Sequence, residues 1–485
     1  MKIVVVGAGV GGLAAAVRLA HGGHEVLVLE QAPAPGGKVG RVQLEEWAFD
    51  TGPSLLTLPH VLRDLFVDTG TRLEDELALV PVEPVTRYGF ADGSAVELSA
   101  DRERSVEALE AWSPGAGADW SRFLDVCSGM WSASQGFLTG LAPWPPRRPR
   151  PGERAPDPRD LLRVRPWQTL RGLARQTVRE RRLRMVVERF ATYAGADPRR
   201  APAALALAGY VEHAFGAWHV RGGLYAMVQA LARRLGQLGG ELRCNTAVRS
   251  IVVGDDGRVR AVETAEGQLG CGAVVCNADA VALHRDLLAR APAPRGERSL
   301  SGFALMLGLG GQAPQVPHHT ILFPDDYDAE FDDVFVDRRP VREPTLYVSC
   351  PSATDPAQAP PRGPGWFVLV NAPMHGADVD WDSLADGYED LVLERLARRG
   401  LDVRERIAVR ARRTPADLER ETGSPGGAIY GTAPHGRLGS LRRPGNLVRR
   451  APGLYLVGGS THPGGGLPLV MLGAATVARE IGPAR

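Results

Sequence analysis

Three glycines and one glutamate near the start of the chain have the spacing of a dinucleotide site. Gly7, Gly9 and Gly12 form the pattern GAGVGG, and Glu30 follows Gly12 by eighteen residues. In such a turn the first glycine permits the tight bend, the second lets the backbone approach a pyrophosphate, and the third lets helix and strand pack closely. A carboxylate at the position of Glu30 accepts hydrogen bonds from ribose hydroxyls and repels a 2′-phosphate. The pattern predicts a site for the ADP part of FAD or NAD rather than NADP.

A second glycine-rich loop, APAPGGKVG, follows Glu30 almost directly. Gly36 and Gly37 let this loop approach a dinucleotide closely, and Lys38 and Arg41 can place positive charge near its pyrophosphate. A strand, an acidic residue and a Gly-Gly-basic loop in immediate succession resemble the FAD-binding half of the glutathione-reductase-like flavoproteins. The sequence therefore favours FAD over NAD.

Few side chains could act as an acid or a base beside such a cofactor. The segment YVEHAFGAWHVRGG offers several polar residues, and one histidine lies in the C-terminal loop THPGGGLP. A histidine with a pKa near neutrality can take the proton that accompanies hydride loss from carbon. The candidate bases are His462, His219 and Glu212, with His213 beside them, and the candidate substrate contacts are Trp218 and Arg221. Each of these side chains could instead serve the fold alone.

The elements around the glycine turn read as a βαβ unit. Apolar residues 3–6 precede the turn, an alanine- and leucine-rich segment follows it, and apolar residues 26–29 end at Glu30. We therefore expect a strand, a helix and a second strand in that order. The C-terminal segment GLYLVGGSTHPGGGLPLVMLGA repeats strand, glycine loop and helix, and Pro468 suits the first helical turn. The N-terminus of this second helix would direct its positive dipole at a ligand.

Between these ends the pattern changes several times. Residues 76–112 alternate in short runs with an Asp92-Gly93 turn, which predicts a hairpin. Residues 119–215 have helical periodicity, broken by the proline-rich segment 141–160. The remaining predicted elements are a helix at 224–238, strands near 241–253, 258–265 and 273–276, strands at 303–309, 345–350 and 366–371, and a helix at 383–399.

These patterns predict an α/β fold whose main unit is a glutathione-reductase-like, Rossmann-type FAD-binding domain. The domain is expected to be discontinuous and to consist of residues 1–75, 221–285 and 416–485. An inserted substrate-binding sheet would consist of residues 76–118 and 286–415, and residues 119–220 would form a helical lid that could associate with a membrane.

The composition argues against several classes of function. A net charge of +1 over 485 residues gives no overall attraction to nucleic acid. The five cysteines are scattered without a CxxC pair, so we expect reduced thiols and no metal site. No apolar run approaches the length of a membrane-spanning helix. The only lysines, Lys2 and Lys38, are both assigned to the nucleotide end, which argues against an amine oxidase that uses an active-site lysine.

An arginine-rich segment stands out against this balanced charge. Residues 147–184 contain thirteen arginines and four acidic residues. Two rows of residues in this segment have helical spacing. The apolar row consists of Trp167, Leu170, Leu173 and Val178, and the basic row consists of Arg171, Arg175, Arg179 and Arg182. The pattern predicts a basic amphipathic helix at a membrane interface, or else a solvated helix in an arginine-rich protein. The first interpretation places the protein in the cytoplasm, on the inner face of the membrane.

The chain resembles the bacterial carotenoid desaturases and isomerases of the phytoene desaturase type, within the amine-oxidase-like flavoproteins. The resemblance is carried by GAGVGGLAAAVRLAHGGHEVLVLEQ, GGKVGRV, FDTGPSLLTLPHVLRDLF, GGLYAMVQALARRLGQLGGELRCNTAV, AVVCNAD, GGAIYG and LYLVGGSTHPGGGLPLVMLGA. The C-terminal motif is most similar to that of hydroxycarotenoid 3,4-desaturases. One departure is Gly458-Gly459-Ser460, where many relatives carry an acid for the ribityl hydroxyls, so that Ser460 or backbone would have to take that role.

The resemblance implies a set of FAD contacts. Glu30 would contact the adenosine ribose, Lys38 and Arg41 the phosphates, Val248 the adenine, and residues 459–471 the ribityl chain and the isoalloxazine. The full set of implied contacts is Gly7, Gly9, Gly11, Gly12, Glu30, Gln31, Gly37, Lys38, Arg41, Gly52, Pro53, Ser54, Val248, Asn277, Gly458, Gly459, Ser460, Gly466, Leu467, Pro468 and Met471.

The activity implied by the resemblance is FAD-dependent desaturation of an isoprenoid polyene, such as phytoene or a hydroxycarotenoid. The alternatives are a polyene cis-trans isomerase, an FAD oxidase or dehydrogenase that tailors an amine or a polyketide, and a non-enzymatic flavin-binding protein. No second GxGxxG opens a helix, because the GLGG at 308–311 runs into Gln312-Ala313-Pro314. No nicotinamide site is therefore expected, and the electron acceptor would be a quinone, O₂ or another carrier.

Overall fold

The computed structural model describes residues 1–140, 158–288, 296–436 and 439–484. A parallel sheet joins five strands that lie far apart in sequence. Its strands, in spatial order, are β19 (Leu454–Leu456), β13 (Ala273–Cys276), β1 (Lys2–Val6), β2 (Glu25–Leu29) and β9 (Glu241–Arg243). β1 and β2 are buried on both faces, which explains why their sequences, KIVVV and EVLVL, are apolar without alternation.

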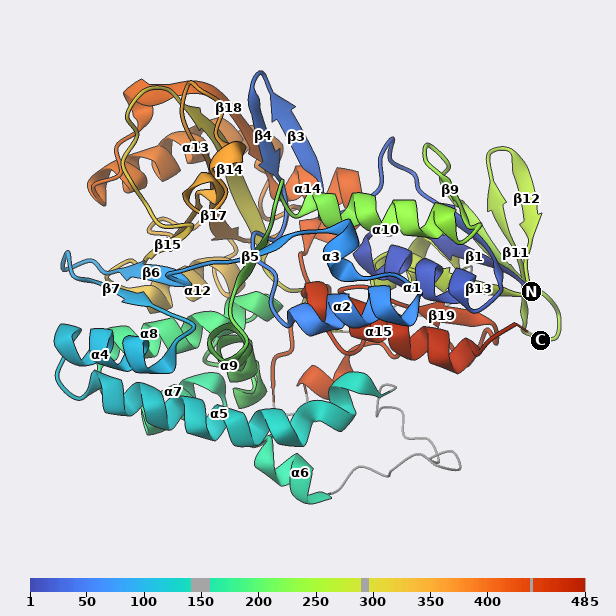
Figure 1. Cartoon of the computed structure of the whole chain (residues 1–485), viewed down its shortest axis with the longest axis horizontal. Coiled ribbons are helices and arrows are strands. Elements are labelled where there is room, and N and C mark those ends of the chain that lie inside the picture. Colours follow the sequence, from blue (N-terminus) through green and yellow to red (C-terminus); the bar gives the residue numbers. More distant parts are fainter. Residues whose placement is uncertain (141–157, 289–295, 437–438, 485) are drawn as a thin grey trace.

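Helices cover one face of the parallel sheet, and a small antiparallel sheet covers the other (Figure 1). The helices that pack on its first face are α1 (Val10–His21), α10 (Tyr225–Gln237) and α15 (Leu467–Ile481), with α2 (Pro59–Asp68) beside α15 and α3 (Leu73–Glu76) after α2. The antiparallel sheet consists of β10 (Ser250–Val253), β11 (Val259–Thr264) and β12 (Gly267–Gly270). The order strand, glycine turn and helix is therefore confirmed at both ends of the chain.

A second sheet of seven strands lies beside the first (Figure 1). Its strands, in spatial order, are β18 (Ile407–Arg413), β14 (Ser301–Leu309), β17 (Gly365–Ala372), β16 (Leu346–Ser349), β15 (His319–Leu322), β6 (Thr86–Gly89) and β7 (Ala95–Leu98). Trp366 and Leu305 on these strands form a core with Trp381 and Leu396 of α13 (Trp381–Arg398). The other helices near this sheet are α12 (Tyr327–Phe335) and α14 (Pro415–Thr422).

Part of the predicted hairpin region is helical instead. β6 and β7 do pair across the Asp92-Gly93 turn, as expected. Residues 102–112, however, form α4 (Arg102–Trp112) rather than further strand, because the Asp101 carboxylate caps the helix by accepting hydrogen bonds from the N–H groups of Glu103 and Arg104. The predicted strand near 241–253 is also two strands, β9 and β10, which belong to different sheets.

A third region is helical. Its elements are α5 (Ala116–Thr139), α6 (Pro158–Arg163), α7 (Leu170–Thr177), α8 (Arg181–Arg189), a 3-10 helix (Phe190–Ala194) and α9 (Ala206–Ala214). Trp120, Phe123 and Phe190 are fully buried in the core of this region, where they meet Tyr88 from the seven-stranded sheet. Most of the proline-rich segment, residues 141–157, lies outside the described residues.

The expectation of one basic amphipathic helix over the arginine-rich segment is wrong. α7 and α8 are separate helices, and Leu170, Leu173 and Val178 are buried in the core instead of facing a membrane.

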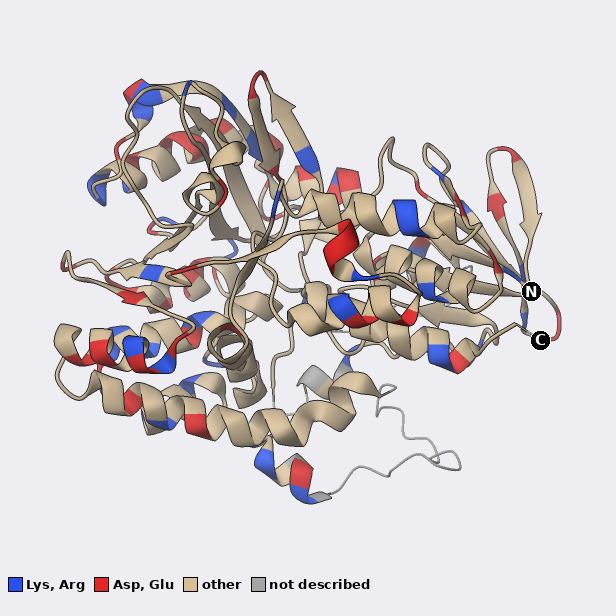
Figure 2. Cartoon of the chain, viewed as in Figure 1, with Lys and Arg blue, Asp and Glu red and all other residues tan. Residues whose placement is uncertain are grey.

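The arginines of the expected basic row are mostly paired with acids from distant elements. Arg171 pairs with Glu188 and Asp328, Arg179 with Asp119, and Arg182 with Asp92. Figure 2 shows basic and acidic residues interspersed over this half of the molecule. These long-range ion pairs explain why the spacing along the chain was misleading.

The remaining described strands and α-helix are short. They are the hairpin of β3 (Arg41–Leu44) and β4 (Trp47–Asp50), the pair of β5 (Leu79–Pro81) and β8 (Trp218–Val220), and α11 (Ala280–Ala282). All five cysteines are free, as expected. Among the described helices, none has both the length and the apolar character needed to cross a membrane.

Candidate functional site

A cavity of about 1830 Å³ lies where the parallel sheet, the seven-stranded sheet and the helical region meet. Small-molecule sites commonly enclose about 300–1,000 Å³, so this space can hold a dinucleotide and a second long molecule. All but three of the residues predicted to contact FAD line the cavity, and the exceptions are Gly12, Arg41 and Met471. The structure thus brings together segments from the start, the middle and the end of the chain.

The glycine turn at the end of β1 is shaped to receive a phosphate. A Cβ atom on Gly12 would lie 2.2 Å from the carbonyl oxygen of Gly7, so α1 can approach the strand only with glycine there. A Cβ atom on Gly9 would lie 2.6 Å from Nδ2 of Asn277. No side chain caps the N-terminus of α1, which leaves its first N–H groups free at the cavity wall. These features fit the pyrophosphate of FAD.

Glu30 is held in place at the end of β2. Its side chain is buried, and its two oxygens accept hydrogen bonds from the N–H groups of Ala8 (2.7 Å) and Ala32 (2.9 Å). Each carboxylate oxygen can accept a further hydrogen bond, and Glu30 lines the cavity. The carboxylate therefore remains available to ribose hydroxyls, although contact with FAD stays a prediction.

The C-terminal glycine loop forms the opposite wall. α15 begins at Leu467 with Pro468 in its first turn and no side-chain cap, so a second free helix N-terminus borders the cavity. The Ser460 hydroxyl, which was expected to serve the ribityl chain, accepts a hydrogen bond from the N–H of Ala280 (2.9 Å). Arg443 donates to the carbonyls of Tyr430 and Gly459, and its burial lowers its pKa to about 10. Positive charge and helix dipole thus meet at this loop.

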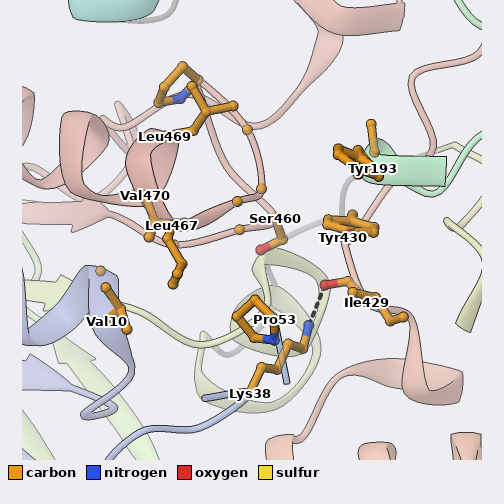
Figure 3. A pocket seen from close by; sticks show the side chains of 18 of the residues that line it. Val10, Lys38, Pro53, Tyr193, Ile429, Tyr430, Ser460, Leu467, Leu469 and Val470 are labelled. Atoms are coloured by element: carbon orange, nitrogen blue, oxygen red, sulfur yellow. Dashed lines mark hydrogen bonds between the residues drawn. The ribbon is translucent and has the colours of Figure 1, made fainter. Parts of the chain in front are cut away.

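Lys38, which was expected near the phosphates, is directed at a loop from the C-terminal part of the chain. Its Nζ donates hydrogen bonds to the carbonyls of Ala428 (3.1 Å) and Ile429 (2.7 Å), and Figure 3 shows it directed at this loop beside Pro53. Burial lowers the pKa of Lys38 to about 8, against the attraction of Asp279, which raises it. The cavity therefore contains a lysine with a lowered pKa, and the argument against an active-site lysine stays a prediction. Arg41 lies exposed on β3, away from the cavity wall.

None of the three candidate bases lines the main cavity. His462 is buried, its Nε2 contacts the carbonyl oxygen of Gly140 (3.1 Å), and its ring meets Phe137 edge-on. Burial lowers the pKa of His462 to about 4. This histidine therefore ties the C-terminal loop to the end of α5.

The other candidate bases are buried behind the cavity wall. His219 lies 3.6 Å from Asp355 in the interior, and burial lowers its pKa. Glu212 is fully buried and accepts a hydrogen bond from the hydroxyl of Tyr193 (2.9 Å). His213 contacts the carbonyl of Ser99 and the ring of Trp120. Their arrangement favours a structural or indirect role.

The remaining sequence candidates also lie off the main cavity. Trp218 donates to the carbonyl of Phe215 and packs against the core of the parallel sheet. Arg221 is exposed, and Met471 is buried among apolar side chains of α15.

The structure adds a group of cavity residues that the sequence analysis missed. These are mainly Arg189, Phe190, Tyr193, Tyr347, Phe367, Leu369, Tyr430 and Arg443. Tyr193 and Tyr430 lie close together in Figure 3, on the same side of the cavity. The only signal in the sequence was GGAIYG, which contains Tyr430, because the other residues come from separate elements.

The chain matches the profile of the Flavin containing amine oxidoreductase family over residues 10–313. It is 34% identical to the 4,4'-diapolycopene oxygenase of a Methylomonas species, over 99% of this chain and 98% of the relative. It is also 34% identical to the hydroxyneurosporene desaturase of Rhodobacter capsulatus, over 99% and 97%. The zeta-carotene-forming phytoene desaturase of Myxococcus xanthus is 33% identical, over 99% and 93%.

Solved structures show that the fold is shared more widely. An oxidoreductase from Methanosarcina mazei superposes with a TM-score of 0.67 at 18% identity, over 99% of this chain and all of the other. Putrescine oxidase superposes with a TM-score of 0.63 at 16% identity, over 99% of both chains. The cavity with its two free helix N-termini, the family profile and the full-length relatives agree. The chain belongs to the flavin-containing amine oxidoreductases, as an FAD-dependent oxidoreductase of the phytoene desaturase type.

Proposed function

We propose that the protein is an FAD-dependent carotenoid desaturase, which removes a hydride and a proton from an isoprenoid polyene. The observation that carries this proposal is the continuity of the cavity. It extends from the cofactor loops past apolar side chains of the helical region, including Phe190, Leu205 and Leu207, to Val164 beside α6. A long apolar substrate fits such a space, and three full-length relatives bear the names of carotenoid-modifying enzymes.

The proposed architecture assigns each part of the chain a role in this reaction. The parallel sheet with its helices is a Rossmann-type FAD-binding domain, the seven-stranded sheet is the inserted substrate-binding sheet, and the helical region is the lid. Bound FAD supplies the hydride acceptor. The chain's own contribution is to hold the polyene in register and to exclude water with an apolar wall, because positioning can supply much of the catalysis.

Anaerobic titration tests this function. Lycopene or a hydroxylated carotenoid, mixed with the FAD-loaded protein without oxygen, should bleach the flavin absorbance and give a product with a longer conjugated system. An isomerase would change the geometry of the polyene without net bleaching. Bleaching by amines or polyketides, with none by any carotenoid, would overturn the proposal in favour of a tailoring oxidase.

We also propose that the protein works as a peripheral protein on the inner face of the cytoplasmic membrane. A carotenoid is insoluble in water, so an enzyme must collect it from a bilayer. Leu162 and Trp167 are more than half exposed, and they flank Arg163 and Val164, which line the cavity. Exposed Trp and Leu beside a basic residue suit a membrane interface. This surface, residues 162–167, replaces the buried leucines of α7 as the proposed contact.

The proposed acceptor of the electrons is a membrane quinone or O₂. A quinone would reach the protein from the same bilayer as the substrate. The absence of a second GxGxxG turn in the sequence supports a route that does not begin at a nicotinamide.

A further inference from the structure

One buried guanidinium in the cavity wall leaves most of its hydrogen-bond donors unused. Arg189, the last residue of α8, is 92% buried and lines the cavity. Its Nη1 donates a hydrogen bond to the hydroxyl of Tyr193 (3.1 Å), and it makes no ion pair with any Asp or Glu of the described residues. Its guanidinium lies against two aromatic rings, 5.1 Å from the ring centroid of Tyr193 and 5.7 Å from that of Tyr347.

The other cations of the cavity wall have partners. Arg413 pairs with Glu421, and Arg163 pairs with Asp160. Lys38 and Arg443 each donate to two backbone carbonyls, and Arg479 donates to the carbonyl of Thr139 and the hydroxyl of Thr476. A buried guanidinium without a carboxylate costs free energy unless something else accepts its hydrogen bonds. Arg189 therefore has donors that remain free for a ligand inside the cavity.

The polar groups around Arg189 favour a ligand that accepts hydrogen bonds over one that donates them. The Tyr193 hydroxyl donates a hydrogen bond to the carboxylate of Glu212 (2.9 Å). The Tyr347 hydroxyl already makes hydrogen bonds with the hydroxyl of Ser54 and with Nδ1 of His319. A ligand group that accepts hydrogen bonds thus finds donors here, whereas a ligand proton finds few free acceptors.

The walls on either side are apolar, with Phe190, Phe367 and Leu369 among them. A ligand that fits both features is a long apolar chain with an oxygen at one end. We infer that Arg189 binds the acceptor oxygen of an oxidised polyene end group through its free donors, while Tyr193 and Tyr347 hold the guanidinium in place. These three residues are the Arg189 cluster. A terminal carboxylate or aldehyde should bind best, a hydroxyl less well because its own proton lacks an acceptor, and a methyl group worst.

The inference rests on the proposed function, because it assumes that the cavity holds a polyene, and it adds a specificity-determining site to it. It also indicates which end enters first. Tyr347 is hydrogen-bonded to Ser54, which belongs to the segment 52–54 that borders the predicted flavin site. The oxygenated end would therefore lie toward the cofactor, with the rest of the chain toward α6.

Direct binding tests the Arg189 cluster without any turnover. Acyclic polyenes of equal length that end in a methyl, hydroxyl, aldehyde or carboxylate group are titrated into the FAD-loaded protein, and binding is read from quenching of tryptophan fluorescence. Trp131 lines the cavity and serves as an internal reporter. A hydrogen bond to a charged group changes affinity by about tenfold or more, so the carboxylate should bind at least about tenfold more tightly than the methyl-ended chain.

Variants then assign this preference to Arg189. Arg189→Met should reduce the preference to below about threefold, because the free donors are lost. Arg189→Lys should keep part of the preference for the carboxylate, since the charge remains, and it covers the case in which Arg189→Met fails to fold. Arg87→Met, which changes an exposed arginine of β6 that pairs with Glu97 and does not line the cavity, is the matched control and should keep the parent preference.

The outcomes separate the two proposals. Equal binding of all four polyenes, or an undiminished preference in Arg189→Met, would overturn the Arg189 cluster and leave the polyene cavity standing. Failure of every polyene to bind, with FAD in place, would overturn the proposed function and the cluster together.

Discussion

The Glu30 carboxylate accepts a hydrogen bond from the N–H of Ala8, at 2.7 Å, and so fastens the end of β2 to the glycine turn after β1. The same side chain holds the next loop through Ala32. Glu30, which the sequence predicts to contact a ribose, therefore also stabilises the turn that would hold the pyrophosphate.

Replacing Glu30 by Gln should weaken FAD binding by about ten- to hundredfold, because a charged acceptor is lost both from the turn and from the ribose site. The fluorescence of FAD released on dilution measures the change. Glu25→Gln, at the exposed start of the same strand, should leave the affinity unchanged. Parent-like affinity in Glu30→Gln would contradict the assignment.

Replacing Gly9 by Val should abolish FAD binding, because the new side chain would occupy the phosphate site. Its Cβ would also lie 2.6 Å from Nδ2 of Asn277, so a second variant is needed to separate the two effects. Gly9→Val with Asn277→Ala removes that contact and should still lack flavin absorbance. Recovery of FAD in the double variant would show that the obstruction was Asn277. Gly236→Ala, with open space around it, is the control.

Lys38 should react with amine-directed reagents at unusually low pH. Burial lowers its pKa to about 8, so its neutral, reactive fraction rises as the pH passes through that value. Competitive acetylation of the flavin-free protein, read at Lys38 by peptide mass spectrometry, should have its midpoint near pH 8. A midpoint near the ordinary lysine value of about 10.4 would show that the side chain is solvated.

NADH and NADPH should not reduce the flavin directly. The sequence offers one dinucleotide turn, and the cavity that it borders is the proposed place of FAD. Anaerobic stopped-flow mixing measures the absorbance of the bound flavin. Rapid bleaching by either nucleotide would reveal a nicotinamide site that we did not recognise.

Leu162→Asp with Trp167→Asp should abolish sedimentation with anionic liposomes while the FAD content stays the same. Both side chains are more than half exposed beside the cavity, and charges there would oppose burial in the interface. Val336→Asp changes another exposed apolar residue, one that does not line the cavity, and should sediment like the parent. Equal sedimentation of the double variant would place membrane contact elsewhere.

Local patterns were enough to predict the cofactor loops. The glycine spacing, the acid after β2 and the final strand, loop and helix are each encoded within about thirty residues, where the physical constraints on turn and helix are strong. The prediction failed where partners lie far apart in sequence. Arg171 was assigned to a membrane surface because its spacing is helical, yet its partner Asp328 comes from a different region of the chain.

The polar side chains of the cavity show the same limit. Arg189 and Tyr347 come from a helix and a strand that meet only in the folded chain, so no local pattern marks them. His462 was a reasonable candidate by residue type, but the loop directs its ring at α5, away from the cavity. Residue type and spacing indicate what a side chain could do, whereas its direction depends on the tertiary packing.

The order of strands in the parallel sheet also has a consequence for biosynthesis. β1 lies between β2 and β13, and β13 pairs with β19, close to the end of the chain. The first glycine turn is therefore synthesised long before the C-terminal glycine loop that faces it across the cavity. FAD should be captured only after translation reaches α15, and nascent chains stalled before residue 454 should emerge without the cofactor.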